Sequence, residues 1–239
     1  MRHLPTAVIF DVEGTLVDCA TAQLESWRRT LAAAGHAFTE ADLQPYSGMD
    51  GMWMLTHLLP DLPQADKEKL LHAQGELYRE EFLARVEPFP AVRELFESLK
   101  AQGIRIAIGT TCQPDQLAAY DEKLHILRLT DVTACGEMVK HGKPDPGLFR
   151  ICLQRLGLEK VEGAMAIGDT PYDARAARTL GIRAIGVSTG VFTAPELLSG
   201  GCSDVFEQVS HTRTLWQPSA NESTRAHPDR DRTRPDVLT

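Results

Sequence analysis

The sequence predicts an α/β fold: a Rossmann-like parallel sheet with helices on both faces, plus a small all-helical domain inserted after the first strand. Short apolar runs rich in β-branched residues recur along the chain, and each indicates a buried strand. Stretches of helical periodicity, often opened by proline and closed by glycine, separate these runs. One interval of about 70 residues carries helical patterns only, and it is too long to be an ordinary connection.

The strand pattern recurs along most of the chain. It covers residues 7–10, 104–108, 164–167 and 184–187, with a weaker run over 131–135. Three helices between these runs open at Pro90, Pro146 and Pro171 and end at Gly103, Gly157 and Gly181. Because strands that alternate with helices pair in parallel, the sheet is expected to bind its ligand at the carboxyl ends of its strands.

The helical interval divides the chain into two predicted domains. Its helical patterns cover residues 21–34, 40–47, 50–59 and 64–85. They place a helical cap domain at 17–88, between the two parts of an α/β core domain at 1–16 and 89–211. The tail, 212–239, has Trp216 as its one aromatic residue among arginines, acids and prolines, so it is expected to be disordered.

Composition disfavours several classes of function. The chain has 239 residues, with 25 lysines and arginines against 33 acidic residues and a net charge of −8, which argues against nucleic-acid binding. The five cysteines are widely spaced and form no C-x-x-C pair, so neither a disulfide framework nor a zinc site is indicated. No apolar run is long enough for a membrane span and no signal peptide is visible, so we expect a cytoplasmic protein. We further expect a monomer or a homodimer.

Two carboxylates follow the first predicted strand. Asp11 and Glu13 are two residues apart, so at the end of an extended strand both side chains point the same way. Charges at the end of an apolar strand are costly unless a metal or a substrate compensates them, which indicates a functional site. Taken alone, the pair also fits a simple Asx turn, with Gly14 letting the chain depart sharply.

Three later loops bring polar groups to the same predicted edge of the sheet. They contribute Thr110 and Thr111 after the strand at 104–108, Lys143 in a turn between glycine and proline, and Asp169 and Asp173 after the strand at 164–167. Hydroxyls and backbone N–H groups bind phosphate oxygens, a fixed ammonium suits a phosphoryl group, and carboxylates suit a magnesium ion. Asp173 has a plainer alternative, because it completes a capping box with Thr170.

Together these segments resemble the signature of the haloacid dehalogenase superfamily of phosphohydrolases. They are D-V-E-G-T-L-V at 11–17, I-G-T-T at 108–111, G-K-P-D-P at 142–146 and G-D-T-P-Y-D at 168–173. The helical interval stands where that family carries its helical cap, and the rest of the chain looks closest to the phosphoglycolate-phosphatase-like branch. The resemblance implies a magnesium-dependent phosphatase that hydrolyses a small phosphorylated metabolite through an aspartyl-phosphate.

The resemblance also implies catalytic roles for individual residues. Asp11 is expected to be the nucleophile, and Glu13 the acid and base that serves the leaving oxygen and the attacking water. Thr110 and Lys143 are expected to orient the phosphate, with Thr111 beside them. Most phosphatases of the family have aspartate where Glu13 stands, so the added methylene changes the reach of this carboxyl group, and the turnover rate is the property that it is expected to affect.

The metal site implied by the resemblance uses the same loops. Magnesium is expected on the Asp11 carboxylate, the main-chain carbonyl of Glu13 and the Asp169 carboxylate. Asp173 is expected to hold Lys143 or a ligand of the metal in place without binding the metal itself, unless its only role is to cap the helix.

Two other functions stay open on the sequence. One is a phosphomutase of the same superfamily, which passes the phosphoryl group to a second sugar hydroxyl. The other is a catalytically silent binding protein on this fold, with Glu13 as the altered position. Residues 43–55 of the cap contain no lysine or arginine, which disfavours a phosphonatase and weakens the phosphomutase. Candidates in the cap for contact with a small leaving group are Tyr46, Ser47, Asp50 and His57, whereas Met49, Met52 and Met54 are expected in the core.

Overall fold

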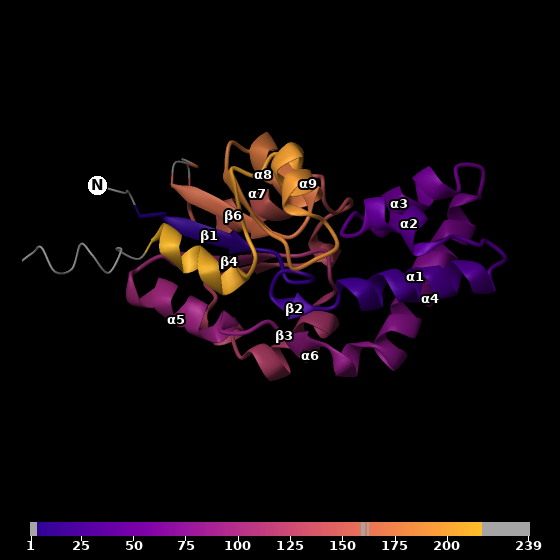
Figure 1. Cartoon of the computed structure of the whole chain (residues 1–239), viewed down its shortest axis with the longest axis horizontal. Helices are drawn as coiled ribbons and strands as arrows, with labels where there is room; N and C mark the ends of the chain where they lie inside the picture. Colours follow the sequence, from indigo (N-terminus) through magenta and orange to yellow (C-terminus); the bar gives the residue numbers. More distant parts are fainter. Residues whose placement is uncertain (1–3, 159–160, 162, 217–239) are drawn as a thin grey trace, which may run out of the picture.

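The computed structural model describes residues 4–158, 161 and 163–216, and it has two lobes (Figure 1). One lobe is a sheet with helices packed around it, and the other holds the helices of the insertion, beyond one end of the sheet. The sheet strands are β1 (Ala7–Phe10), β4 (Arg105–Gly109), β5 (Val132–Ala134), β6 (Ala164–Gly168), β7 (Arg183–Val187) and β8 (Asp204–Phe206). Their order is β5-β4-β1-β6-β7-β8, and all neighbours are parallel, which confirms the predicted fold class.

The central strand, β1, fixes where the functional loops meet. Its register pairs Phe10 with Ile108 of β4 on one side and with Ile167 of β6 on the other. Because the three strands run parallel and in register, the residues that follow them leave the sheet at the same edge. The edge is therefore built by chain segments that are far apart in the sequence.

Helices cover both faces of β1, which explains its continuous apolar sequence. Phe10 belongs to a buried cluster with residues of α5 (Val92–Ala101). Ile9, which points the other way, belongs to a second cluster with α7 (Gly147–Arg155) and α8 (Pro171–Thr179). The sheet thus lies between two apolar layers, and its polar loops are confined to the edge.

The insertion folds as a small helical bundle with its own apolar core. Its helices are α1 (Ala20–Ala33), α2 (Glu40–Leu43), α3 (Gly51–Leu58) and α4 (Gln64–Glu81), with short 3-10 helices η1 (Gln44–Tyr46) and η2 (Leu83–Arg85). The buried residues that form this core are Leu24, Leu31, Leu43, Met54, Leu55 and Leu70. These elements follow the predicted helical patterns closely.

The two tethers of the insertion pair with each other. β2 (Val17–Asp18) runs antiparallel to β3 (Glu87–Pro88), and the backbone N–H of Phe89 donates to the carbonyl of Leu16 at 2.9 Å. No strand is predicted there from the sequence, because two residues are too few to show a period. The paired tethers support the proposal that the cap is residues 17–88 and the core is 1–16 and 89–211.

The remaining elements extend the core beyond the prediction. They are α6 (Pro114–Leu124), α9 (Ala194–Gly200), η3 (Leu127–Leu129), η4 (Gly136–Met138) and η5 (Val209–Leu215). The predicted start of the disordered tail at 212 is wrong for its first residues, because Thr212 lies in η5 and Trp216 is only 2% exposed. Residues 217–239, the rest of that predicted tail, lie outside the described residues. Within the described ranges, no helix combines the length and hydropathy that a bilayer crossing needs.

Candidate active site

The loop after β1 folds tightly against the loop after β6. Asp11 is 5% exposed, and its backbone N–H donates to the carbonyl of Ile167 at 2.9 Å. Gly14 has a φ of 75°, and a Cβ there would collide with the Asp169 carboxylate. The Thr15 hydroxyl donates to Asp169 Oδ1 at 2.9 Å. A glycine at position 14 therefore lets the first loop approach the second acid closely.

Lys143 connects two of the predicted acids. Its side chain is buried, and Nζ lies 2.6 Å from Asp11 Oδ1 and 2.7 Å from Asp173 Oδ1. The face of the Phe149 ring lies beneath the ammonium, 5.9 Å away at its centroid. Lys143 is thus held by a carboxylate on either side and by an aromatic ring, so its charge has a fixed position.

Asp173 both caps α8 and binds Lys143. Its Oδ2 accepts hydrogen bonds from the Thr170 hydroxyl at 2.6 Å and the Thr170 N–H at 3.2 Å, which completes the predicted capping box of α8. Its Oδ1 accepts from Lys143. The capping role and the supporting role are therefore compatible, because each uses a different carboxylate oxygen.

Three buried carboxylates gather around this point. One oxygen from each of Asp11, Asp169 and Asp173 lies within 4.8 Å of the others. With the single ammonium of Lys143, the four groups leave an excess of two negative charges when all are ionised. Burying such an excess is costly, and a divalent cation held by oxygen ligands would balance it. The donor set therefore fits Mg²⁺.

Burial dominates the proton equilibria of the cluster. It raises the pKa of Asp11 to about 7, against the lowering effect of Lys143. It also raises the pKa of Asp169, with Asp173 and Asp11 adding to the shift. Burial alone would lower the pKa of Lys143, but Asp11 and Asp173 outweigh it and the net shift is upward. Lys143 therefore stays charged at neutral pH.

Thr110 and Thr111 lie at the end of β4, next to the loop after β1. Thr110 is fully buried, its N–H donates to the carbonyl of Ala134 at 3.0 Å, and its hydroxyl accepts from the N–H of Cys112 at 3.3 Å. Thr111 lines the cavity described below. The sheet register thus brings both to the edge that carries Asp11, as predicted from the order of the loops.

The carboxylate of Glu13 lies among helices rather than in the acid cluster. Its Oε1 accepts three hydrogen bonds: from Gln23 Nε2 at 2.6 Å, from Gln116 Nε2 at 2.9 Å and from the Tyr120 hydroxyl at 2.8 Å. Burial raises the pKa of Glu13, while the bonds from Tyr120 and Gln23 lower it. All three donors use one oxygen, so they fix the carboxylate and leave Oε2 outside this set of bonds.

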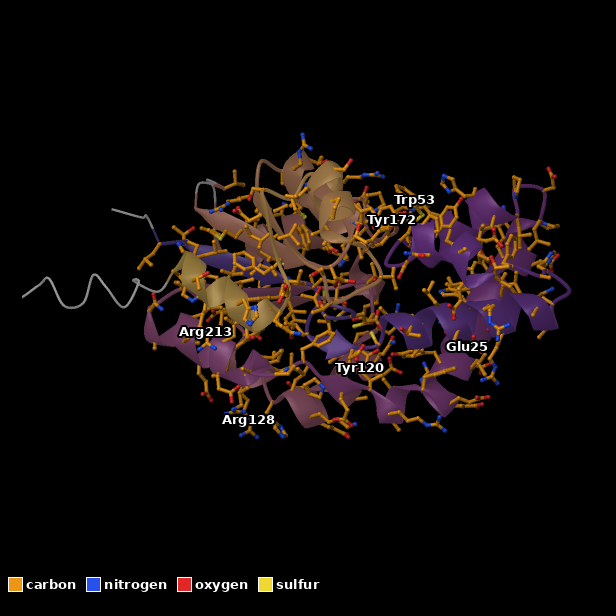
Figure 2. The ribbon with its side chains drawn as sticks, viewed as in Figure 1. Glu25, Trp53, Tyr120, Arg128, Tyr172 and Arg213 are labelled. Carbon is orange, nitrogen blue, oxygen red and sulfur yellow. The ribbon has the colours of Figure 1, made fainter. Side chains whose placement is uncertain are left out.

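These three donors come from both lobes. Gln23 belongs to α1 of the insertion, whereas Gln116 and Tyr120 belong to α6 of the core. The Tyr120 hydroxyl also lies 2.7 Å from the Tyr78 hydroxyl of α4. Figure 2 shows Tyr120 where the sheet lobe meets the insertion. None of the three donors is predicted from the sequence, because neutral side chains on separate helices form no local motif.

Asp50 fastens the insertion to the loop of Lys143. Its Oδ1 accepts from the N–H of Trp53 at 3.0 Å as the N-cap of α3, and its Oδ2 accepts from the N–H of Gly142 at 2.8 Å. The N–H of Asp50 donates to the carbonyl of Lys143 at 2.9 Å. The Tyr172 hydroxyl donates to the carbonyl of Pro45, and Figure 2 shows Trp53 and Tyr172 at this junction of the lobes.

A cavity of about 310 Å³ lies between the two lobes. Glu13, Asp169 and Thr111 line it from the core, and Tyr46, Ser47 and Asp50 line it from the insertion. Met49, Met52 and Met54 also line it, so their predicted placement in the core is only partly right: Met54 is 3% exposed and belongs to the apolar core as well. Asp169 is thus the member of the acid cluster that lines this space, which can hold a small molecule.

Comparison with known proteins identifies the fold family. The haloacid dehalogenase-like hydrolase family matches residues 8–187. The chain belongs to this family. It is 31% identical over 199 residues to a phosphoglycolate phosphatase of Agrobacterium fabrum, covering 81% of this chain and 85% of that protein. It is 29% identical over 184 residues to the fructose-1-phosphate phosphatase YqaB of Escherichia coli, covering 75% of this chain and 95% of that protein.

Solved structures agree with this assignment. A hydrolase from Pseudomonas syringae superposes with a TM-score of 0.81 at 25% identity, covering 87% of this chain and 96% of that one. The predicted resemblance to the haloacid dehalogenase superfamily, and with it the prediction of a hydrolase, is confirmed. In this haloacid dehalogenase-like hydrolase, the four predicted signature segments are the loops that meet at the sheet edge.

Proposed function

We propose that this haloacid dehalogenase-like hydrolase is a magnesium-dependent phosphatase of small phosphomonoesters, with Asp11 as the nucleophile. The observation that carries the proposal is the buried cluster in which Lys143 bridges Asp11 and Asp173 while Asp169 stands beside them. Its relatives from Agrobacterium fabrum and Escherichia coli are named as phosphatases, which supports the same chemistry.

The first step transfers the phosphoryl group to Asp11. A carboxylate oxygen of Asp11 attacks phosphorus, the bond to the leaving oxygen breaks, and Glu13 gives its proton to that oxygen. Lys143, fixed by its two carboxylates, offsets negative charge on the transferring group. Thr110 offers its hydroxyl at the same edge, and Thr111 offers its hydroxyl and N–H. Burial raises the pKa of Glu13, which favours the protonated form that this step needs.

The second step frees Asp11. Glu13, now ionised, takes a proton from water, the water oxygen attacks phosphorus, and the bond to the Asp11 oxygen breaks to release phosphate. Asp11 and Asp169, with the carbonyl of Glu13, would hold the magnesium ion, and Asp173 would stabilise Lys143 beside it. When bound, the ion supplies positive charge that lets the anionic Asp11 approach an anionic substrate.

Hydrolysis of p-nitrophenyl phosphate tests the proposal. We expect purified protein to release nitrophenol and inorganic phosphate with added Mg²⁺, and chelation by EDTA to remove this activity until Mg²⁺ is restored. A phosphomutase would show poor net release of phosphate in the same assay. Absence of turnover with Mg²⁺ would favour a silent binding protein on this fold.

Replacing Glu13 tests its acid–base role. We expect Glu13→Gln to slow the steady-state turnover of an alkyl phosphate by about 10²- to 10³-fold, because neither proton transfer has a donor or acceptor. With p-nitrophenyl phosphate, whose leaving group needs no proton, the same variant should give a rapid burst of nitrophenol followed by slow turnover. Glu13→Asp keeps the carboxyl group and serves as the matched control. Full turnover in Glu13→Gln would show that this role is wrong.

Replacing Tyr120 tests how Glu13 is held. The Tyr120 hydroxyl stabilises the ionised form of Glu13, so Tyr120→Phe should raise the pKa of Glu13 further. Because the protonated form serves the first step, the alkaline limb of kcat/KM for an alkyl phosphate should move to higher pH. Tyr78→Phe is the control, since Tyr78 bonds Tyr120 and not Glu13. The positioning role of Tyr120 would be contradicted if the alkaline limb of kcat/KM did not move in Tyr120→Phe, or if it moved equally in Tyr120→Phe and Tyr78→Phe.

A further inference from the structure

We infer that the cavity selects a phosphomonoester with an uncharged, hydroxyl-bearing leaving group, such as a polyol or sugar phosphate, over one with a second anion. This inference rests on the proposed function, and it concerns the leaving group alone. In the proposed function the phosphoryl group lies at Lys143 and the acid cluster. Asp169 and Glu13 also line the cavity between the lobes, which places the leaving group in that cavity.

The cavity has almost no positive charge with which to bind a second anion. Among the described residues that line it, Arg79 of α4 is the only lysine or arginine. Its side chain is 54% exposed, and its Nη2 lies 3.3 Å from Asp115 Oδ2. The charge of Arg79 is therefore about half exposed and already paired with Asp115, so a carboxylate or second phosphate in the cavity would have no buried counter-charge of its own.

The acidic side chains that line the cavity already bind other groups, which argues against a cationic leaving group. Among the described lining residues they are Glu13, Asp50 and Asp169. Both carboxylate oxygens of Asp50 accept backbone N–H groups. Glu13 is held by three donors, and Asp169 belongs to the cluster that fits Mg²⁺. Oε2 of Glu13 lies outside these bonds, and the proposed function uses it for the leaving oxygen, so an ammonium group in the substrate would compete with that step.

The rest of the lining suits hydroxyl groups and C–H faces. Its uncharged polar side chains can donate to and accept from hydroxyls, and they include Tyr46, Ser47, Gln74, Gln113 and Gln116. Its apolar side chains include Leu24, Trp27, Met52 and Leu71. Such a mixture matches a polyol, whose polar groups alternate with apolar C–H surface.

Three two-carbon substrates whose terminal groups differ in charge test the inference. They are 2-hydroxyethyl phosphate, which is neutral beyond the phosphate, 2-phosphoglycolate, which carries a carboxylate, and phosphoethanolamine, which carries an ammonium. We expect kcat/KM for 2-hydroxyethyl phosphate to exceed both others by at least about tenfold, because an unpaired charge in the cavity is costly. Glycerol 3-phosphate against 3-phosphoglycerate repeats the comparison with a longer leaving group.

A cation placed in the cavity should change this preference. Leu71 lines it from α4 and is 37% exposed, so a lysine there can keep its stem in contact and its charge near the substrate. We expect Leu71→Lys to raise the ratio of kcat/KM for 2-phosphoglycolate over 2-hydroxyethyl phosphate by about fivefold or more. Leu71→Met is the matched control without the charge, and Arg79→Gln should leave the ratio of the parent protein unchanged.

The outcomes separate this inference from the proposed function. Turnover of p-nitrophenyl phosphate with a preference for 2-phosphoglycolate or phosphoethanolamine would overturn the inference and keep the phosphatase. A selective loss of 2-phosphoglycolate turnover in Arg79→Gln would also overturn it, because Arg79 would then bind the anion. Absence of turnover with every ester, p-nitrophenyl phosphate included, would overturn the proposed function itself.

Discussion

Replacing Asp11 with Asn is expected to abolish phosphate release, lowering kcat by roughly four orders of magnitude or more. The amide has nearly the shape of the carboxylate but cannot attack phosphorus to form an aspartyl-phosphate. Hydrolysis of p-nitrophenyl phosphate with Mg²⁺ measures the effect. Borohydride reduction of the working enzyme converts an aspartyl-phosphate into a stable alcohol, and peptide mass analysis should locate that product at Asp11.

The Asp11→Asn variant is expected to fold. Lys143 keeps its 2.7 Å contact with Asp173, and the loss of one buried carboxylate reduces the excess of negative charge. A thermal melt no lower than that of the parent protein is the control for this point. Substantial turnover in a folded Asp11→Asn variant, or modification of another residue in the parent, would refute the nucleophile assignment.

The residues of the acid cluster could be predicted because each belongs to a short local motif. Asp11 and Asp169 both follow runs of apolar residues, and the rule that parallel strands end at one edge places them together. Lys143 has no such strand before it, but a turn between glycine and proline distinguishes it from a surface lysine. The structure then adds what the motifs do not contain, namely that one ammonium bridges two acids.

The residues that surround Glu13 could not be predicted, because they belong to no short local motif. Gln116 and Tyr120 are 103 and 107 residues from Glu13 along the chain, and glutamine and tyrosine on a helix surface carry no functional signature. Their meeting depends on how the insertion and α6 pack, which is a property of the tertiary fold. Trp216 shows the same limit, because its burial against the core overrides the polar composition around it.

Replacing Lys143 with Met is expected to lower the stability of the protein as well as its activity. Lys143 is 1% exposed, and its loss leaves Asp11 and Asp173 buried without a counter-charge. Removing one partner of a buried ion pair costs about 3 to 5 kcal/mol, and phosphate release should fall by about 10²-fold or more because the transferring group loses its fixed ammonium. Denaturant unfolding without metal and the p-nitrophenyl phosphate assay measure the two effects.

The pH dependence identifies the cause of the lost stability. A buried carboxyl whose pKa is higher in the folded than in the unfolded protein binds more protons when folded, so its contribution to stability falls as pH rises between the two values. For Asp11 the window runs from the ordinary value of 3.8 to about 7 with Lys143 present, and it extends higher without it. Lys143→Met should therefore be destabilised much more at about pH 8 than at about pH 5.

Two further variants separate charge from packing at this position. The double variant Asp11→Asn with Lys143→Met removes one of the two unpaired acids, so it should recover much of the stability lost at about pH 8. Lys143→Arg keeps the charge, but its planar guanidinium does not reproduce a single Nζ between two oxygens, so it should recover stability better than activity. A loss of stability in Lys143→Met that is equal at both pH values would mean that packing over Phe149, rather than charge on Asp11 and Asp173, sets the cost.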